Sequence, residues 1–173
     1  MSGPPGFEEY VTARRDQLVR TAYLLTGDVH QAEDLVQTAL IRIWPRWTRV
    51  SGVQDIDAYV RRTLFTVFVT SIRRRRWREL TTDPHDHSWS GPTPDDIARA
   101  EHRVDLRDVL SGLAPRQRAV LVLRYYLDLS EAESASILDC SVGTIKSQSA
   151  KALKHLRGTP AIADVPAERT GRR

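Results

Sequence analysis

Residues 130–157 read SEAESASILDCSVGTIKSQSAKALKHLR, and this stretch decides the fold of the second half of the chain. Ser130 and Glu133 have the spacing of a capping box, in which each side chain satisfies the backbone amide of the other, so a helix is expected to begin there. A turn follows at residues 139–141, where Ser141 can cap the next helix. Two short helices joined by such a turn predict a helix-turn-helix.

The second helix of this motif divides into two faces on a helical wheel. Small and apolar side chains share the face expected to pack inward, namely Ile145, Ser149, Ala152, Leu153 and Leu156. The opposite face is polar and cationic and has no carboxylate, which suits the major groove of DNA, whereas an ordinary solvated helix is usually mixed in sign. We predict DNA contacts from Ser141, Thr144, Lys146, Ser147, Gln148 and Lys151.

Apolar residues recur at helical spacing through the rest of the chain as well. They predict a helix from Phe7 to Leu25 and a second helix that follows Asp28, has its buried stripe from Ala32 to Ile43 and is interrupted at Pro45. A third helix is expected from about Ala58 to Trp77, after a loop at residues 48–54. Residues 81–94 are rich in Thr, Asp, Pro, Ser and Gly, as linkers are. No strand-like alternation occurs, so the fold class is all-α, with two small helical domains. The expected boundaries are a disordered arm at 1–6, a first domain at 7–77, a linker at 78–98, a second domain at 99–157 and a flexible tail at 158–173.

Charge is distributed unevenly between these segments. Residues 1–77 carry +4 (12 basic, 8 acidic), residues 78–98 carry −4 (1 basic, 5 acidic) and residues 99–157 carry +3 (10 basic, 7 acidic). Two basic blocks on either side of an acidic connector fit two modules that each meet a polyanion.

Other features exclude several classes of function. The single cysteine, Cys140, excludes an internal disulfide and a cysteine-cluster metal site. No apolar run is long enough to span a bilayer and no signal-peptide pattern opens the chain, so we expect a cytoplasmic protein. The chain has no Gly-rich phosphate loop, and residues 85–87 (His-Asp-His) lack further ligands of plausible spacing. We therefore expect no enzyme activity, no cofactor and no metal site.

One face of the helix at residues 32–43 carries apolar side chains away from its core stripe. Ile41 and Trp44 lie there among polar residues, a mixture that indicates a protein-docking face, although partial burial against another helix is an equal alternative. The candidate docking residues are Asp34, Gln37, Thr38, Ile41 and Trp44.

The helix at residues 58–77 has a non-core face without any acid, and it ends in four consecutive arginines followed by Trp77. Such runs are often only solvated, but here the run extends a face that already lacks negative charge, so phosphate contact is favoured. Aromatic and planar cationic side chains also stack on unpaired bases. The candidate DNA-binding residues are Tyr59, Arg62, Thr66, Val69, Arg73, Arg74, Arg76 and Trp77.

Several motifs together resemble the extracytoplasmic-function (group IV) class of sigma-70 factors, in particular an actinobacterial subgroup. Residues 32–37 (AEDLVQ), 41–44 (IRIW) and 57–62 (DAYVRR) resemble sigma region 2. Residues 113–120 (LAPRQRAV), 123–125 (LRY) and 142–147 (VGTIKS) resemble sigma region 4. The motifs occur in the family's order and spacing over residues 7–77 and 99–157.

This resemblance implies a transcription initiation factor. Region 2 would bind the clamp helices of the largest subunit of core RNA polymerase and would melt and read the minus-ten element. Region 4 would read the minus-thirty-five element and meet the flap of the second-largest subunit. An anti-sigma factor commonly holds such proteins inactive. Thr66, Thr70, Asp139, Gln148 and Ser149 depart from the family's usual residues, so a promoter sequence cannot be carried over.

Two further expectations depend on how the modules act together. A helix-turn-helix regulator that works without core polymerase is the main alternative, but it leaves residues 28–77 unexplained. The acidic connector, which contains Pro and Gly, predicts a flexible tether between rigid modules, whose arrangement polymerase rather than mutual packing would set. A docked, autoinhibited free form is the opposite expectation.

Overall fold

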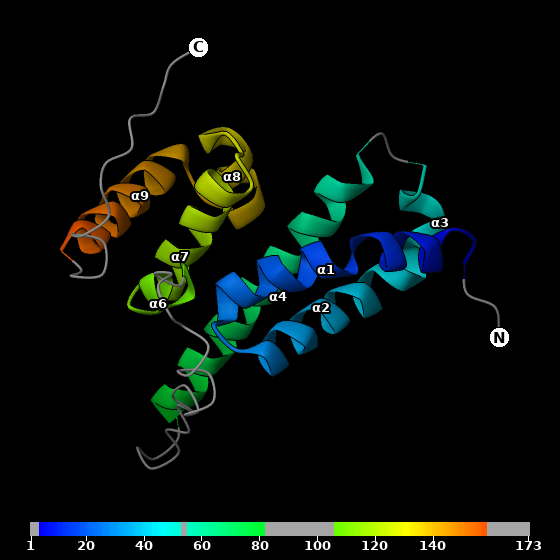
Figure 1. Cartoon of the computed structure of the whole chain (residues 1–173), viewed down its shortest axis with the longest axis horizontal. Helices are drawn as coiled ribbons and strands as arrows, with labels where there is room; N and C mark the ends of the chain where they lie inside the picture. Colours follow the sequence, from blue (N-terminus) through cyan, green and yellow to red (C-terminus); the bar gives the residue numbers. More distant parts are fainter. Residues whose placement is uncertain (1–3, 53–54, 82–105, 159–173) are drawn as a thin grey trace, which may run out of the picture.

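The computed structural model describes residues 4–52, 55–81 and 106–158 (Figure 1), and the described residues contain no strand. The prediction of an all-α fold is therefore confirmed. The elements in chain order are α1 (Phe7–Thr26), α2 (Val29–Ile43), the 3-10 turn η1 (Trp44–Arg46), α3 (Trp47–Val50), α4 (Ile56–Thr81), α6 (Leu106–Ser111), α7 (Pro115–Leu121), the π-helical turn η2 (Val122–Tyr126), α8 (Glu131–Leu138) and α9 (Val142–Arg157). No helix in the described part of the chain is both long and apolar enough to cross a membrane.

Local capping interactions set the beginnings of the helices. Asp28 begins α2 by accepting a hydrogen bond from the Gln31 amide at 2.8 Å, and Asp55 does the same for Ala58 of α4 at 2.8 Å. Gly27 ends α1 at a φ of 76°, in the left-handed region where glycine avoids the steric cost of a side chain. α1 and α2 form a hairpin, and α2 packs against α4 (Figure 1).

The helix-turn-helix forms as its sequence predicts. The Glu133 amide donates to the Ser130 hydroxyl at 3.1 Å, and the Ser130 amide donates to the Glu133 carboxylate at 2.7 Å, which completes the capping box. These hydrogen bonds lower the pKa of the Glu133 carboxyl. Asp139 ends α8 at a φ of 50°, and Ser141 caps α9 by accepting from the Thr144 amide at 3.1 Å.

An aromatic cluster at the start of the chain differs from the expected arm and loop. Trp47 lies in α3 and is only 3% exposed, whereas the expected loop began directly after it. The ring of Phe7 meets Trp47 edge-on at 5.0 Å, and Tyr10 lies 5.1 Å from the same indole. The Trp47 indole donates to the carbonyl of Pro5 at 2.9 Å. Residues 4–6, assigned to the disordered arm, are therefore held against α3.

The two groups of helices share one apolar core, which contradicts the expectation of modules that do not pack together. Buried residues from α1, α2 and α4 form a continuous cluster with buried residues of α6, α7 and η2. α1 contacts α6, α7 and η2, and α4 contacts α7 and α8. The polar composition of a linker does not determine whether the apolar surfaces of the two modules that it joins pack together. The rest of the expected linker beyond Thr81, with His85 and His87, lies outside the described residues.

Candidate nucleic-acid and protein interfaces

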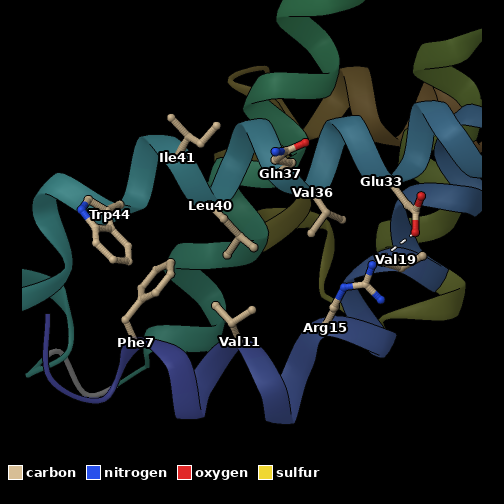
Figure 2. Close-up of a pocket in the computed structure, with 10 residues that line it drawn as sticks. All are labelled: Phe7, Val11, Arg15, Val19, Glu33, Val36, Gln37, Leu40, Ile41 and Trp44. Carbon is tan, nitrogen blue, oxygen red and sulfur yellow. Dashed lines mark hydrogen bonds and ion pairs between the residues drawn. The ribbon is translucent and has the colours of Figure 1, made fainter. Parts of the chain in front are cut away.

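A groove of about 600 Å³ runs between α1 and α2 on the side away from α4 (Figure 2). Its floor is apolar because valine side chains of both helices face it together with Phe7 and Leu40. An ion pair between Arg15 and Glu33, at 3.2 Å, lies at one end. The lining residues are Phe7, Val11, Arg15, Val19, Glu33, Val36, Gln37, Leu40, Ile41 and Trp44.

The structure gathers part of the predicted docking set at this groove. Gln37, Ile41 and Trp44 line it, whereas Asp34 and Thr38 are exposed on α2 outside it. Ile41 is 63% exposed and Trp44 is 43% exposed, although Trp44 also meets Phe7 edge-on at 4.8 Å. Partial burial, the alternative interpretation, therefore applies to Trp44 more than to Ile41.

Sequence reasoning missed the contribution of α1 to this groove. Val11 and Val19 belong to the apolar spacing of α1, and nothing in that spacing shows that they stay partly uncovered. The groove exists only once α1 pairs with α2. Such an apolar groove with polar rims fits an amphipathic helix whose apolar face lies along it.

The predicted DNA face of α4 is accessible. Arg62, Thr66, Arg73 and Arg74 are exposed, and Tyr59 and Val69 are half-buried beside them. The Thr66 hydroxyl donates to the Arg62 carbonyl at 2.7 Å, so it is satisfied by its own helix in the free chain. Arg76 and Trp77 lie on the last turns of α4, but their side chains are outside what the structure describes.

Hydroxyl groups on the polar face of α9 form hydrogen bonds within the helix and its cap. The hydroxyls of Ser141 and Thr144 are 2.9 Å apart, and Ser147 donates to the Thr144 carbonyl at 3.0 Å. Lys151 is exposed and Gln148 is half-buried on the same helix. Burial of Ile145 and Ala152 confirms the inward face predicted for α9.

Lys146 has a different environment from the other predicted residues of α9. Its ammonium group pairs with Glu131 of α8 at 3.6 Å, and both side chains are partly exposed. An exposed pair of this kind contributes little energy, so it leaves Lys146 able to turn toward a phosphate. The carboxylate nevertheless reduces the positive potential at this position compared with Lys151.

Two residues outside every predicted set are central to the packing beside these surfaces. Phe65 of α4 is wholly buried, although it belongs to none of the residue sets predicted from the sequence. Arg118 of α7 is 9% exposed and lies between the two helix groups. No periodic signal within one module could reveal the position of Arg118, because one of its hydrogen-bond acceptors is Leu25 of the other module.

Comparison with known proteins adds independent findings. The family described as Sigma-70 region 2 matches residues 10–78, and the family described as Sigma-70, region 4 matches residues 103–156. The RNA polymerase sigma-E factor of Streptomyces coelicolor is 40% identical over 163 residues, which cover 93% of this chain and 89% of the relative. The ECF RNA polymerase sigma factor SigL of Mycobacterium tuberculosis is 36% identical over 148 residues, covering 82% and 81%.

Among solved structures, the sigma factor RpoE from Bartonella quintana, in complex with the anti-sigma factor NepR, has a similar fold. Its TM-score is 0.62 at 22% identity, over 87% of this chain and 94% of that chain. CnrH, in complex with the cytosolic domain of CnrY, has a TM-score of 0.54 at 21% identity, over 87% of this chain and 84% of that chain.

Proposed function

The chain belongs to the extracytoplasmic-function class of sigma-70 factors, and from this premise we propose that three of its surfaces divide the work of bringing core RNA polymerase to promoters. As a sigma factor it directs promoter recognition, strand opening and transcription initiation. The polymerase supplies the catalysis, so the chain needs no active site of its own. Because its partner is the polymerase on chromosomal DNA, we place its action in the cytoplasm.

The groove between α1 and α2 is the proposed docking site for the clamp helices of the largest polymerase subunit. Ile41 and Trp44 offer apolar area at its rim, and Gln37 offers hydrogen bonds beside them. Asp34 and Thr38 lie exposed on the same helix and would form the polar edge of the contact. An apolar centre with a polar rim is the usual organisation of such an interface. Region 4 would meet the flap of the second-largest subunit.

The exposed face of α4 is the proposed site for the minus-ten element. Arg62, Arg73 and Arg74 supply positive charge for the phosphates, and Tyr59 and Val69 supply a half-buried wall beside them. An unpaired base needs both features, because its phosphate is charged and its ring has lost its stacking neighbours. Thr66, whose hydroxyl now bonds within the helix, could turn toward a base edge. Arg76 and Trp77 would extend this face.

The polar face of α9 is the proposed site for the minus-thirty-five element. Gln148 can form a bidentate pair with adenine, and Lys151 can reach guanine or a phosphate. Ser141, Thr144 and Ser147 lie at the amino-terminal end of the helix, where backbone amides also favour a phosphate. Lys146 would add a phosphate contact at the side of the helix.

The single observation that carries this assignment is the apolar groove with Ile41 exposed at its rim. A helix-turn-helix regulator that acts without polymerase needs no such surface on its other module. Run-off transcription with an actinobacterial core RNA polymerase tests the proposal, with a promoter template selected from a random library. We expect specific transcripts only when the chain is added. Sequence-specific DNA binding without transcripts and without core association would favour the regulator.

An anti-sigma factor is a further proposed partner. RpoE and CnrH, which share the fold, were each solved in complex with another protein, and RpoE's partner is an anti-sigma factor. A regulator that covers the groove between α1 and α2 would block docking on polymerase directly. We propose domain boundaries at residues 7–77 and 99–157 for the two modules.

A further inference from the structure

The turn that precedes α1 is tied to α3 through Trp47. The buried Trp47 indole donates to the carbonyl of Pro5 at 2.9 Å. Pro4 and Pro5 have restricted φ angles, so this carbonyl is presented at a small cost in conformational entropy. Gly6 then turns the chain into α1 at a φ of 77°, in the left-handed region that glycine enters without steric cost. One hydrogen bond therefore fixes this turn against a helix that lies some forty positions further along the chain.

Three aromatic rings in a row connect this turn with the groove between α1 and α2. Trp47 meets Phe7 edge-on with ring centres 5.0 Å apart, and Phe7 meets Trp44 edge-on at 4.8 Å. Phe7 is buried between them, whereas Trp44 is 43% exposed. Aromatic pairs favour such edge-to-face arrangements over other relative orientations. The orientation of the Trp44 ring therefore depends on Trp47 through Phe7.

Phe7 and Trp44 form one end of the groove, where Figure 2 shows their two rings facing each other. The ion pair of Arg15 and Glu33 lies toward the other end. Exposed tryptophans at such a site are frequent anchors of protein interfaces, and they contribute a large share of the binding energy. Trp47 does not line the groove and is buried, so a partner in the groove cannot touch it.

A ring that is already held binds a partner more tightly than a ring that is free to turn. A large side chain that becomes ordered only on binding loses its rotamer freedom at that moment, which weakens the complex. Because Phe7 packs on Trp44 in the free chain, this loss occurs when the chain folds. The groove is then preorganised for a helix whose apolar face covers Trp44 and Ile41.

We propose that Pro5, Phe7 and Trp47 form a latch that holds Trp44 in the orientation that core polymerase requires. Trp47 is then a positioning residue for docking, and the docking site extends from α2 to the turn before α1. The inference rests on the proposed assignment of the groove to the clamp helices. The alternative is that the three rings only stabilise the fold, which predicts an unchanged affinity for polymerase in every variant that still folds.

Two variants release the latch at different points. Trp47→Phe keeps a ring beside Phe7 but removes the N–H group that holds Pro5. Gly6→Ala places a side chain at a φ of 77°, which strains the turn and displaces the Pro5 carbonyl. Each variant should raise the dissociation constant for core polymerase about 3- to 10-fold, because Trp44 then becomes ordered only on binding. If one variant loses its helical circular dichroism, the other decides the outcome.

Val50→Ala is the matched control for a loss of stability. Val50 is buried in α3 together with Trp47, but it does not line the groove. Its truncation should lower the free energy of unfolding in urea titrations, while the dissociation constant for core polymerase stays within about twofold of the wild-type value. If Val50→Ala weakens docking as much as Trp47→Phe does, the loss follows from stability and the positioning role is wrong.

Fluorine NMR reads the surroundings of the Trp44 ring directly. The chain has four tryptophans, so incorporation of 5-fluorotryptophan gives four signals, and a Trp44→Phe chain identifies the signal of Trp44. In the Trp47→Phe and Gly6→Ala chains this signal should move toward its position in the urea-unfolded chain, whereas in the Val50→Ala chain it should stay at its wild-type position. A Trp44 signal that does not move in either folded latch variant would overturn the inference.

A double-mutant cycle tests whether Trp47 acts through Trp44. In a Trp44→Ala chain, Trp47→Phe should change the dissociation constant for core polymerase by less than about twofold, because no indole is left to position. A full effect of Trp47→Phe in that chain would contradict the positioning role.

Ile41→Ala separates this inference from the proposed function, because Ile41 lies at the rim of the groove and outside the latch. If Ile41→Ala weakens docking and the two latch variants do not, the latch is wrong and the assignment of the groove stands. If all three variants leave the dissociation constant unchanged, the assignment of the groove to polymerase is contradicted together with the latch.

Discussion

Replacing Ile41 by alanine should weaken docking on core polymerase far more than it affects folding. Ile41 lies at the rim of the groove between α1 and α2, and it is 63% exposed in the free chain (Figure 2). Because most of its side chain makes no contact within the chain, its truncation should change the free energy of unfolding by less than about 0.5 kcal/mol. Any large decrease in affinity for core polymerase must therefore come from contacts that Ile41 makes in the complex.

The expected loss follows from the exposed share of the side chain. Burying a whole isoleucine side chain contributes about 1.5–3 kcal/mol, so covering the exposed part of Ile41 should contribute about 1–2 kcal/mol. This free energy corresponds to a dissociation constant for core polymerase that is raised about 5- to 30-fold. A titration of core polymerase against the chain, labelled at its carboxyl terminus and followed by fluorescence anisotropy, resolves a change of this size.

Val29 provides a matched control on the same helix. It is 53% exposed at the start of α2 and does not line the groove, so Val29→Ala removes a similar exposed apolar group elsewhere. The dissociation constant of the Val29→Ala chain for core polymerase should stay within about twofold of the wild-type value. Equal effects of Ile41→Ala and Val29→Ala, or no effect of either in folded protein, would refute the assignment of the groove to polymerase.

Three further predictions concern the DNA faces and the capping box. Gln148→Ala should relax preference at one position of the minus-thirty-five element, with a loss of about 1–3 kcal/mol against the favoured base, in a promoter library selection. If the Gln148→Ala chain keeps the same base preference at every position of the minus-thirty-five element, Gln148 does not read a base. Arg73→Ala should weaken binding across sequences and lower the slope of log affinity against log salt by about one, as the loss of one phosphate contact requires. Ser130→Ala should lower the free energy of unfolding by about 0.5–2 kcal/mol in urea titrations. Since the partner carboxyl of Glu133 has a lowered pKa, the capping box stabilises the fold at neutral pH. This contribution should be lost as the pH falls through the folded-state pKa, and a stability that stays flat over that range would contradict it.

The parts of this fold that the sequence predicts well are those fixed by neighbours in the chain. The Ser130 and Glu133 capping box and the Ser141 cap each join residues three positions apart, so spacing alone identifies them. The faces of α9 also follow from one helical period. By contrast, Pro45 suggested the end of a helix, whereas the chain continues through η1 and buries Trp47. The residues that bury it, Phe7 and Tyr10, come from the start of α1.

The packing of α6, α7 and η2 against α1 and α4 is the feature that no local pattern could reveal. Arg118 follows Arg116 at the start of α7, where an exposed side chain is the ordinary expectation. Burial lowers the pKa of its guanidinium, and the four carbonyls around it compensate for the lost water. Three of those carbonyls belong to its own module and one belongs to α1, so the site is complete only when the modules meet. The hydrogen bonds of Arg118 therefore depend on the packing of the whole chain and not on any single helix.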